Sequence, residues 1–289
     1  KILTGSAVLT VLVFGLLLPI FGSFPRKGFW SLVLFLISIG FFIKASFNSG
    51  YAIGTAKPNS LLYVYNADSK KAVWTTYDIN LDPWTKLYLG ENPKDASELN
   101  KNPLFSKYKS GFTYSVEANV IDLDEPTISF LQDSIGGSQH YYKISITPNR
   151  QVNRYDVFAN ENMTFYNLKA NGATALDQKG SLYKRRGKKL ISYYVVDNEP
   201  LELQFSIPVT AVFDMDLMES SFDLISNPKF KIAKRLPWMM PTPFVLNDAV
   251  VIQKKIVPPN GVRKPDNFKS RNLTSKDSLT VSVDTIITK

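Results

Sequence analysis

Residues able to carry acid–base or metal chemistry are few in this sequence. It holds one histidine, His140, and no cysteine, so the chain itself lacks disulfides, thiolate metal ligands and a cysteine nucleophile. His140 lies among Gln139, Tyr141 and Tyr142, in a segment whose composition predicts a strand. As a metal ligand it would depend on carboxylates as partners, and we therefore expect a surface or hydrogen-bonded strand histidine.

Carboxylates form two short clusters, Asp122, Asp124 and Glu125 in one and Asp214, Asp216 and Glu219 in the other. Spaced acidic side chains in a loop can bind calcium through their oxygens. Neither cluster has the spacing or the glycine of an EF-hand loop. We expect solvated turns at both places, with a calcium site as the alternative.

The glycine patterns that accompany other catalytic sites are missing. The sequence has no G-x-S-x-G nucleophile turn, no Walker-type loop and no dinucleotide-binding glycine motif. We therefore predict no catalytic residue, no metal site and no cofactor in this chain.

The formal charge of +9 is divided unevenly along the chain. Residues 1–50 carry a net +4 and residues 252–289 a net +5, so the part between them is neutral. A neutral body with basic ends is poorly suited to neutralising a row of phosphates, and we do not expect nucleic-acid binding.

The first forty-seven residues predict how the chain is positioned in the cell. Two apolar runs, residues 2–24 and 28–43, are separated by Pro25, Arg26 and Lys27. A helix of about 20 apolar residues spans the hydrocarbon core of a bilayer, and a slightly shorter one nearly does. We predict a transmembrane helical hairpin over 1–47. A cleavable signal peptide is the alternative for the first run, but a second apolar run follows at once.

The short turn between the two runs predicts the orientation of the hairpin. Arg26 and Lys27 make this turn basic, and basic turns prefer the cytoplasmic side of a membrane. Both ends of the hairpin, and the body that follows, would then lie outside the cytosol.

After a polar linker at 48–60, the chain has the composition of an all-β domain. Val-, Tyr-, Trp- and Thr-rich runs recur between turn signals, and no long amphipathic helix is evident. We expect a mainly β fold, an antiparallel β-sandwich over 61–257. The predicted strands are 61–65, 71–77, 112–120, 127–131, 141–147, 155–159, 164–169, 190–196, 201–207, 211–215 and 249–256.

The chain becomes basic and polar over 258–289, which is typical of a disordered or loosely docked tail. Alternating apolar residues at 279–287 leave two interpretations open. The stretch is either a strand added to a sheet edge or no regular structure at all.

The densest charge in the body is the run Lys184, Arg185, Arg186, Lys188 and Lys189, with Gly187 between them. The glycine predicts the tip of a β-hairpin. A solvated turn is one interpretation of the charges. Contact with anionic lipid headgroups is the other, because a tethered domain stays near the membrane surface.

Two segments resemble a known family. Residues 57–68 (KPNSLLYVYNAD), continuing to 72–78 (AVWTTYD) and 82–85 (DPWT), resemble the region after the last membrane helices of multi-pass zinc aminopeptidases. These are bacterial relatives of the endoplasmic-reticulum and vacuolar-membrane metallopeptidases. Residues 236–243 (LPWMMPTP) and 247–251 (NDAVV) are similar to the closing motif of the same proteins. Residues 165–172 (FYNLKANG) and 193–205 fit the pattern between them, in order.

The resemblance implies a parent protein with a two-zinc peptidase domain, a set of membrane helices and an extracytoplasmic β-domain. The zinc ligands of that family lie in the peptidase domain, so none is transferred to this chain, and zinc is expected only there. The chain would be the non-catalytic membrane anchor and β-domain of such an enzyme, in the bacterial inner membrane with its body in the periplasm. Its partners would be the membrane and that peptidase domain.

Two other functions stay open. The chain could be a structural or binding subunit of a membrane complex without peptidase activity. It could also bind carbohydrate through exposed Trp and Tyr side chains.

The closing motif contains three large apolar residues, Trp238, Met239 and Met240, between prolines that disfavour helix. One interpretation is an extended segment packed across the core of the body. The other is a docking surface for a partner domain.

Overall fold

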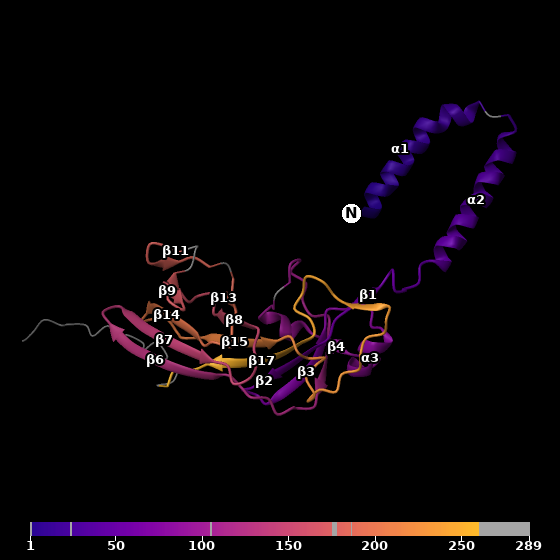
Figure 1. Cartoon of the computed structure of the whole chain (residues 1–289). Helices are drawn as coiled ribbons and strands as arrows, with labels where there is room; N and C mark the ends of the chain where they lie inside the picture. The colour runs from indigo at the N-terminus through magenta and orange to yellow at the C-terminus, as the bar shows by residue number, and fades with distance from the viewer. Residues whose placement is uncertain (1, 24, 105, 175–177, 186, 260–289) are drawn as a thin grey trace, which may run out of the picture.

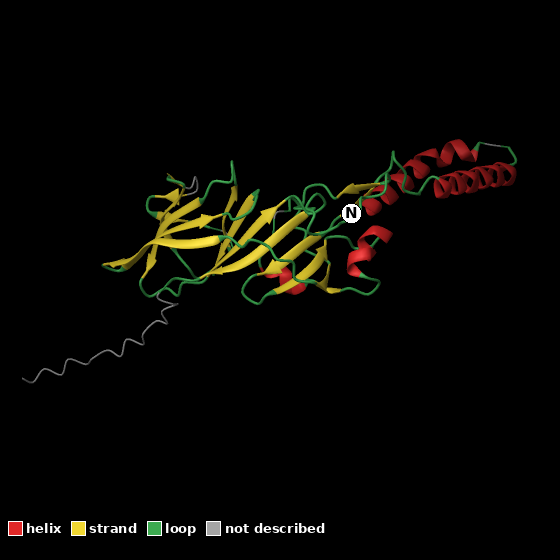
Figure 2. Cartoon of the chain, turned by 60° about the horizontal axis from the view of Figure 1, so that its bottom comes forward, coloured by secondary structure: helices red, strands yellow, loops and turns green. Residues whose placement is uncertain are grey.

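The computed structural model of the chain describes residues 2–23, 25–104, 106–174, 178–185 and 187–259. The described residues form three α-helices and a mainly β body whose sheets are largely antiparallel (Figures 1 and 2). The mainly β fold predicted from the sequence is confirmed. Apart from Pro258 and Pro259, the tail at 258–289, with its alternating stretch 279–287, lies outside the described residues.

The two apolar runs are helices α1 (Ile2–Gly22) and α2 (Lys27–Phe47), which extend away from the body (Figure 1). Arg26 precedes α2 with a left-handed φ of 56°. By length and composition one described helix, Lys27–Phe47, could cross a membrane, with a mean hydropathy of 1.9 and no buried residue. Residues Gly5–Ile20 of α1 form a shorter apolar stretch. The pairing of the two helices as a transmembrane hairpin stays a prediction.

The strands form two large sheets and one small one. The eight-stranded sheet has the order β13-β8-β15-β17-β2-β3-β5-β4, built from Lys189–Tyr194, Arg154–Ala159, Met215–Ser221, Ala249–Ile256, Leu62–Asn66, Lys71–Thr76, Tyr114–Ala118 and Lys94–Asp95. The seven-stranded sheet has the order β11-β12-β9-β14-β7-β6, built from Gln178–Lys179, Leu182–Tyr183, Phe165–Ala170, Leu201–Pro208, Gln139–Thr147 and Thr127–Gly136, with β10 (Ala173–Thr174) beside β9. In the small sheet β1 (Lys57–Asn59) pairs with β16 (Met239–Pro241). Two described pairs are parallel, β1 with β16 and β17 with β2.

The two large sheets share one hydrophobic cluster. Ile144 and Leu203 of the seven-stranded sheet pack in it with Val157 and Leu217 of the eight-stranded sheet. Because side chains alternate along a strand, the neighbouring residue Met218 belongs to a different cluster on the opposite face. The eight-stranded sheet is therefore buried on both faces around β15.

Away from the seven-stranded sheet, other parts of the chain cover the eight-stranded sheet. On one face Tyr63 and Val250 pack with Trp84 of helix α3 (Pro83–Leu89). On the other face Val251 packs with Leu104, in the connection that also contains a 3₁₀ helix at Ser97–Lys101. Two-sided burial explains why β2 and β17 contain continuous apolar runs rather than alternating ones.

Helix α3 begins where the sequence predicts only a turn. Asp82 caps it by accepting hydrogen bonds from the backbone N–H groups of Trp84 and Thr85, at 3.0 and 2.9 Å, and Pro83 occupies the first helical position. The hydroxyl of Thr85 accepts from the N–H of Asp82 in return, at 2.9 Å. This reciprocal cap starts a helix that the short apolar stretch after it does not reveal.

Two sequence predictions for β15 and the residues before it are wrong. The strand predicted at 211–215 is instead a connection, and the strand begins at Met215 and runs to Ser221 as β15. Asp216 and Glu219, both expected in a solvated turn, lie in β15, where Asp216 is half-buried and Glu219 is fully buried. Strand β15 lies between β8 and β17 with both faces covered. Its sequence contains polar residues, so it lacks the apolar run that would predict a buried strand.

Candidate functional site

The single histidine is part of a hydrogen-bonded strand pair. His140 on β7 contacts the Asp133 carboxylate on β6, with Nε2 to Oδ1 at 2.5 Å, and Nδ1 lies 2.9 Å from the Tyr142 hydroxyl. An imidazole that donates from Nε2 accepts at Nδ1, so both ring nitrogens have partners. The prediction of a hydrogen-bonded strand histidine is confirmed.

One member of the first carboxylate cluster, Glu125, belongs to a charge network of the body. Glu125 lies 2.6 Å from Lys70 Nζ and 3.1 Å from Lys254 Nζ, and it accepts from the Tyr65 hydroxyl at 3.0 Å. Although burial opposes its charge, hydrogen bonds from both lysines hold the pKa of Glu125 below its ordinary value. Among the described residues, no group of three or more His, Cys, Asp or Glu side chains is placed to hold a metal ion.

The second cluster includes a buried ion pair. Arg150 Nε donates to Glu219 Oε1 at 2.7 Å, and its other guanidinium nitrogens reach the Ser221 hydroxyl and the Val250 carbonyl oxygen. Glu219 is fully buried, so the guanidinium supplies the compensation that a buried carboxylate requires. The pair fastens the connection before β8 onto the sheet.

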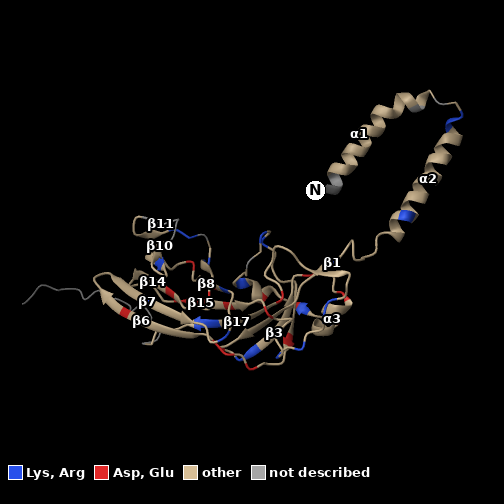
Figure 3. Ribbon diagram, viewed as in Figure 1, with Lys and Arg blue, Asp and Glu red and all other residues tan. Residues whose placement is uncertain are grey.

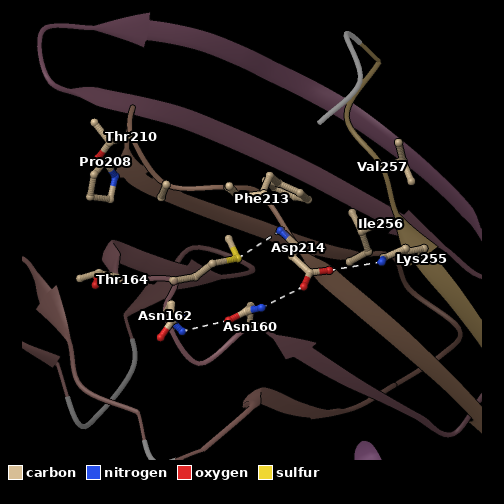
Figure 4. Close-up of a pocket in the computed structure, with 13 residues that line it drawn as sticks. Asn160, Asn162, Thr164, Pro208, Thr210, Phe213, Asp214, Lys255, Ile256 and Val257 are labelled. Atoms are coloured by element: carbon tan, nitrogen blue, oxygen red, sulfur yellow. Dashed lines mark hydrogen bonds and ion pairs between the residues drawn. The ribbon is translucent and has the colours of Figure 1, made fainter. Parts of the chain in front are cut away.

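A cavity of about 780 Å³ lies beside the connection before β15 and the end of β17 (Figure 4). Asp214 is its charged centre: it accepts from Asn160 Nδ2 at 3.1 Å and pairs with Lys255 at 3.3 Å. Phe213 and Ile256 form part of the apolar wall. The polar part of its lining offers hydroxyl, carboxylate and ammonium groups, from Thr210, Asp214 and Lys255, for hydrogen bonds beside this apolar wall.

The basic run does not form a hairpin tip, and that prediction is wrong. Strand β12 before it pairs with β9 in the seven-stranded sheet, and β13 after it pairs with β8 in the eight-stranded sheet. The run therefore crosses from one sheet to the other. Figure 3 places β11, the strand preceding β12, at the end of the body away from β1.

The cations of this run differ in their surroundings. The Arg185 guanidinium donates to backbone carbonyl oxygens at the end of β8, in the connection after β8 and in its own connection, those of Ala159, Asn160, Met163, Gly187 and Lys188. Lys189 pairs with Asp156 at 3.2 Å. Lys184 and Lys188 are exposed, and Arg186 lies outside the described residues. Lipid contact by the run stays a prediction. Lys184 and Lys188 could make such a contact, since neither forms an ion pair with a carboxylate among the described residues.

The segment expected either to pack or to dock is partly buried and partly exposed, and its docking role stays a prediction. Met239 is 7% exposed and belongs to the cluster that contains Tyr63, whereas Met240 is 40% exposed. Trp238 is half-buried and stacks on Tyr51 of the linker, with ring centroids 6.3 Å apart. The difference follows from strand geometry, since neighbouring residues of β16 point to opposite sides.

This segment also pairs with β1, the strand in which the linker from α2 ends. The Lys57 N–H donates to the Trp238 carbonyl oxygen at 2.8 Å, and β1 pairs with β16 over three residues. The predicted linker at 48–60 therefore ends in a strand. Its polar composition, with Asn59 and Ser60, concealed this strand.

A buried polar cluster fixes β1 from the other side, and sequence reasoning missed it. Asn59 is fully buried; its Nδ2 donates to Asp82 at 2.8 Å and its Oδ1 accepts from Arg235 Nε at 2.5 Å. Arg235 forms a bidentate pair with Asp248, both contacts at 2.6 Å, and stacks over Trp84. These residues come from segments far apart in the chain, so no local pattern predicts their meeting.

None of the family models or curated proteins with which the chain was compared matches it. The resemblance to zinc aminopeptidases therefore depends on the segments quoted from the sequence alone.

Proposed function

We propose that this chain is the non-catalytic membrane anchor and extracytoplasmic β-sandwich domain of a membrane-bound zinc-dependent aminopeptidase. Helices α1 and α2 would form a transmembrane hairpin in a bacterial inner membrane, with the body in the periplasm. Peptide hydrolysis, and the zinc it needs, would belong to a peptidase domain outside this chain.

The observation that carries the membrane anchor is the exposure of α2. Its 21 residues have a mean hydropathy of 1.9 and none is buried against the body. Apolar surface in water costs roughly 25 cal/mol per Å², so a helix of this kind is stable only in lipid or against other helices. The surrounding medium that suits it is a bilayer.

The joint between anchor and body supports a scaffolding role. The linker from α2 enters β1, which is fixed by β16 on one side and by the Asn59 cluster on the other. The buried hydrogen bonds fix the point at which the linker leaves the body. Such a joint suits a domain that positions or covers a neighbouring catalytic domain.

The experiment starts from native membranes and an antibody against the body. Carbonate washing should leave the body in the membrane pellet, and immunoprecipitation in mild detergent should recover chelator-sensitive aminopeptidase activity. Release by carbonate would refute the anchor. Retention without any such activity would favour the alternative, a structural or binding subunit of a membrane complex that contains no peptidase.

A further inference from the structure

Two loops of the body present a pair of exposed aromatic rings. Tyr108 is 68% exposed and Phe244 is 53% exposed, yet their rings contact each other edge to face with centroids 5.9 Å apart. Lys107 Nζ lies 4.6 Å from the Phe244 ring centroid and 5.7 Å from that of Tyr108. We name Lys107, Tyr108 and Phe244 the aromatic foot.

The backbone holds the foot in this position. Ser106 and Val245 form a β-bridge between the two loops, and the Lys107 N–H donates to the Phe244 carbonyl oxygen at 2.9 Å. Phe244 has a φ of 64°, a left-handed conformation that is unfavourable for a bulky residue. The bonds between the two loops thus hold the backbone of Phe244 in this conformation, which leaves the rings of Tyr108 and Phe244 exposed to solvent.

The foot lies close in the chain to β16, the strand that pairs with β1 at the end of the linker from α2. Phe244 follows β16 by three residues, and just after that strand the Thr242 N–H donates to the Asn59 carbonyl oxygen at 2.9 Å. Strand β1 in turn continues into the linker to α2, at the side of the body that faces the helices (Figure 1). Along that linker Tyr51 and Ile53 are also exposed, at 57% and 81%.

We propose that the aromatic foot rests in the headgroup region of the membrane that α2 enters, as a second point of attachment for the body. The inference rests on the proposed membrane anchor. Aromatic rings favour the boundary between hydrocarbon and water, and lysines beside them pair with anionic headgroups. Lys107 and Lys109 supply these cations, and both are exposed.

The second attachment has a mechanical consequence. A linker of nine residues between α2 and β1, with Gly50 and Gly54 in it, would by itself leave the body free to swing. Contact between the foot and the bilayer fixes the tilt of the body relative to the membrane. The body then presents one constant face to any neighbouring domain.

The test uses the full chain in nanodiscs of phosphatidylcholine and phosphatidylglycerol, at one copy per disc. Because the sequence has no cysteine, a single introduced cysteine carries one environment-sensitive fluorophore. Ser110→Cys reports on the foot, Ser38→Cys on α2 and Ser134→Cys on strand β6, which lies at the opposite side of the body from β1 (Figure 1). Lipids with a nitroxide at the headgroup or in the acyl chain act as quenchers.

We expect the emission of the Ser110→Cys label to be blue-shifted by the less polar membrane interface and to be quenched by headgroup nitroxide. The Ser134→Cys label should show neither effect. Phe244→Ser and Tyr108→Ser together should abolish that quenching. The matched control Leu131→Ser, which removes an apolar side chain that is 55% exposed on β6, should have no effect.

The outcomes separate the inference from the proposed function. Acyl-chain quenching at Ser38→Cys without quenching at Ser110→Cys overturns the foot and leaves the anchor intact. Quenching at Ser110→Cys that survives loss of both rings also overturns it. An unquenched Ser38→Cys label refutes the anchor itself.

Discussion

Met239 and Met240 are neighbours in β16 with opposite surroundings, and substituting each by alanine tests whether this segment packs or docks. Met239 is 7% exposed within a hydrophobic cluster, and Met240 is 40% exposed. Replacing a buried methionine by alanine costs about 2–5 kcal/mol through lost contacts and a cavity. The same change at a surface position costs less than about 0.5 kcal/mol.

The assay is the thermal unfolding of the full chain in nanodiscs, followed by tryptophan fluorescence. For a body of this size each kcal/mol lowers Tm by about 2–4 °C, so a loss of about 3 kcal/mol in Met239→Ala lowers it by roughly 6–12 °C. Met240→Ala should leave Tm within about 2 °C of the wild type. Met239→Leu, which conserves volume, is the control for side-chain loss.

Equal effects of the two alanine variants would refute this reasoning, because they would mean that β16 does not alternate as described. A stable Met239→Ala variant that loses a binding partner would instead assign the buried side of the segment to docking.

Three further predictions concern ionisable side chains that are fully or partly buried. Glu219→Gln leaves the guanidinium of Arg150 buried without a carboxylate, and we expect denaturant titration to show a loss of about 3–5 kcal/mol. Burial raises the pKa of Asp78 to about 6, so its stabilising contribution, about 2 kcal/mol after allowing for partial exposure, is complete below about pH 4 and is lost as the pH rises through 6. Asp78→Asn should remove this part of the pH dependence of Tm, and an unchanged profile would argue against it. Arg185→Lys keeps the charge but cannot reach several carbonyl oxygens at once, so it should accelerate proteolysis within 160–189, whereas Lys184→Gln should not.

Much of the β body was predictable because its strands are short apolar runs bounded by turn residues. Strand β17 has the predicted bounds, Ala249–Ile256, since both of its faces are buried and nearly every residue in its first half is apolar. The hairpin β2–β3 was predictable from its polar loop, where the Asn66 side chain accepts from the N–H groups of Asp68 and Ser69. These features depend on neighbours in the sequence.

The features that escaped prediction depend on partners far away in the sequence. Strand β15 contains Glu219, which looks like a turn residue until Arg150 is known to neutralise it. The basic run resembles a hairpin tip because a single sequence does not show that β12 and β13 pair with strands of different sheets. Strand β1 looks like linker because Asn59 is buried by contacts to Asp82 and Arg235.

The candidate surfaces were predictable only in part. Composition identified Trp238, Met239 and Met240 as a special segment, but alternation along β16 decides which of them is buried. The aromatic foot had no signal in the sequence, because Tyr108 and Phe244 are isolated aromatic residues in separate loops. Only the bridge between those loops brings them together.

The claim that the chain is anchored by a hairpin with its body outside the cytosol is tested most directly by thiol labelling of intact spheroplasts. Single cysteines at Ser69 in the body, Ser38 in α2 and Ser23 beside the basic turn are exposed to a membrane-impermeant maleimide. We predict labelling of Ser69→Cys in intact cells, of Ser23→Cys only after permeabilisation, and of Ser38→Cys in neither case. Protection of Ser69→Cys until the membrane is opened, or labelling of Ser38→Cys within intact membranes, would contradict the account.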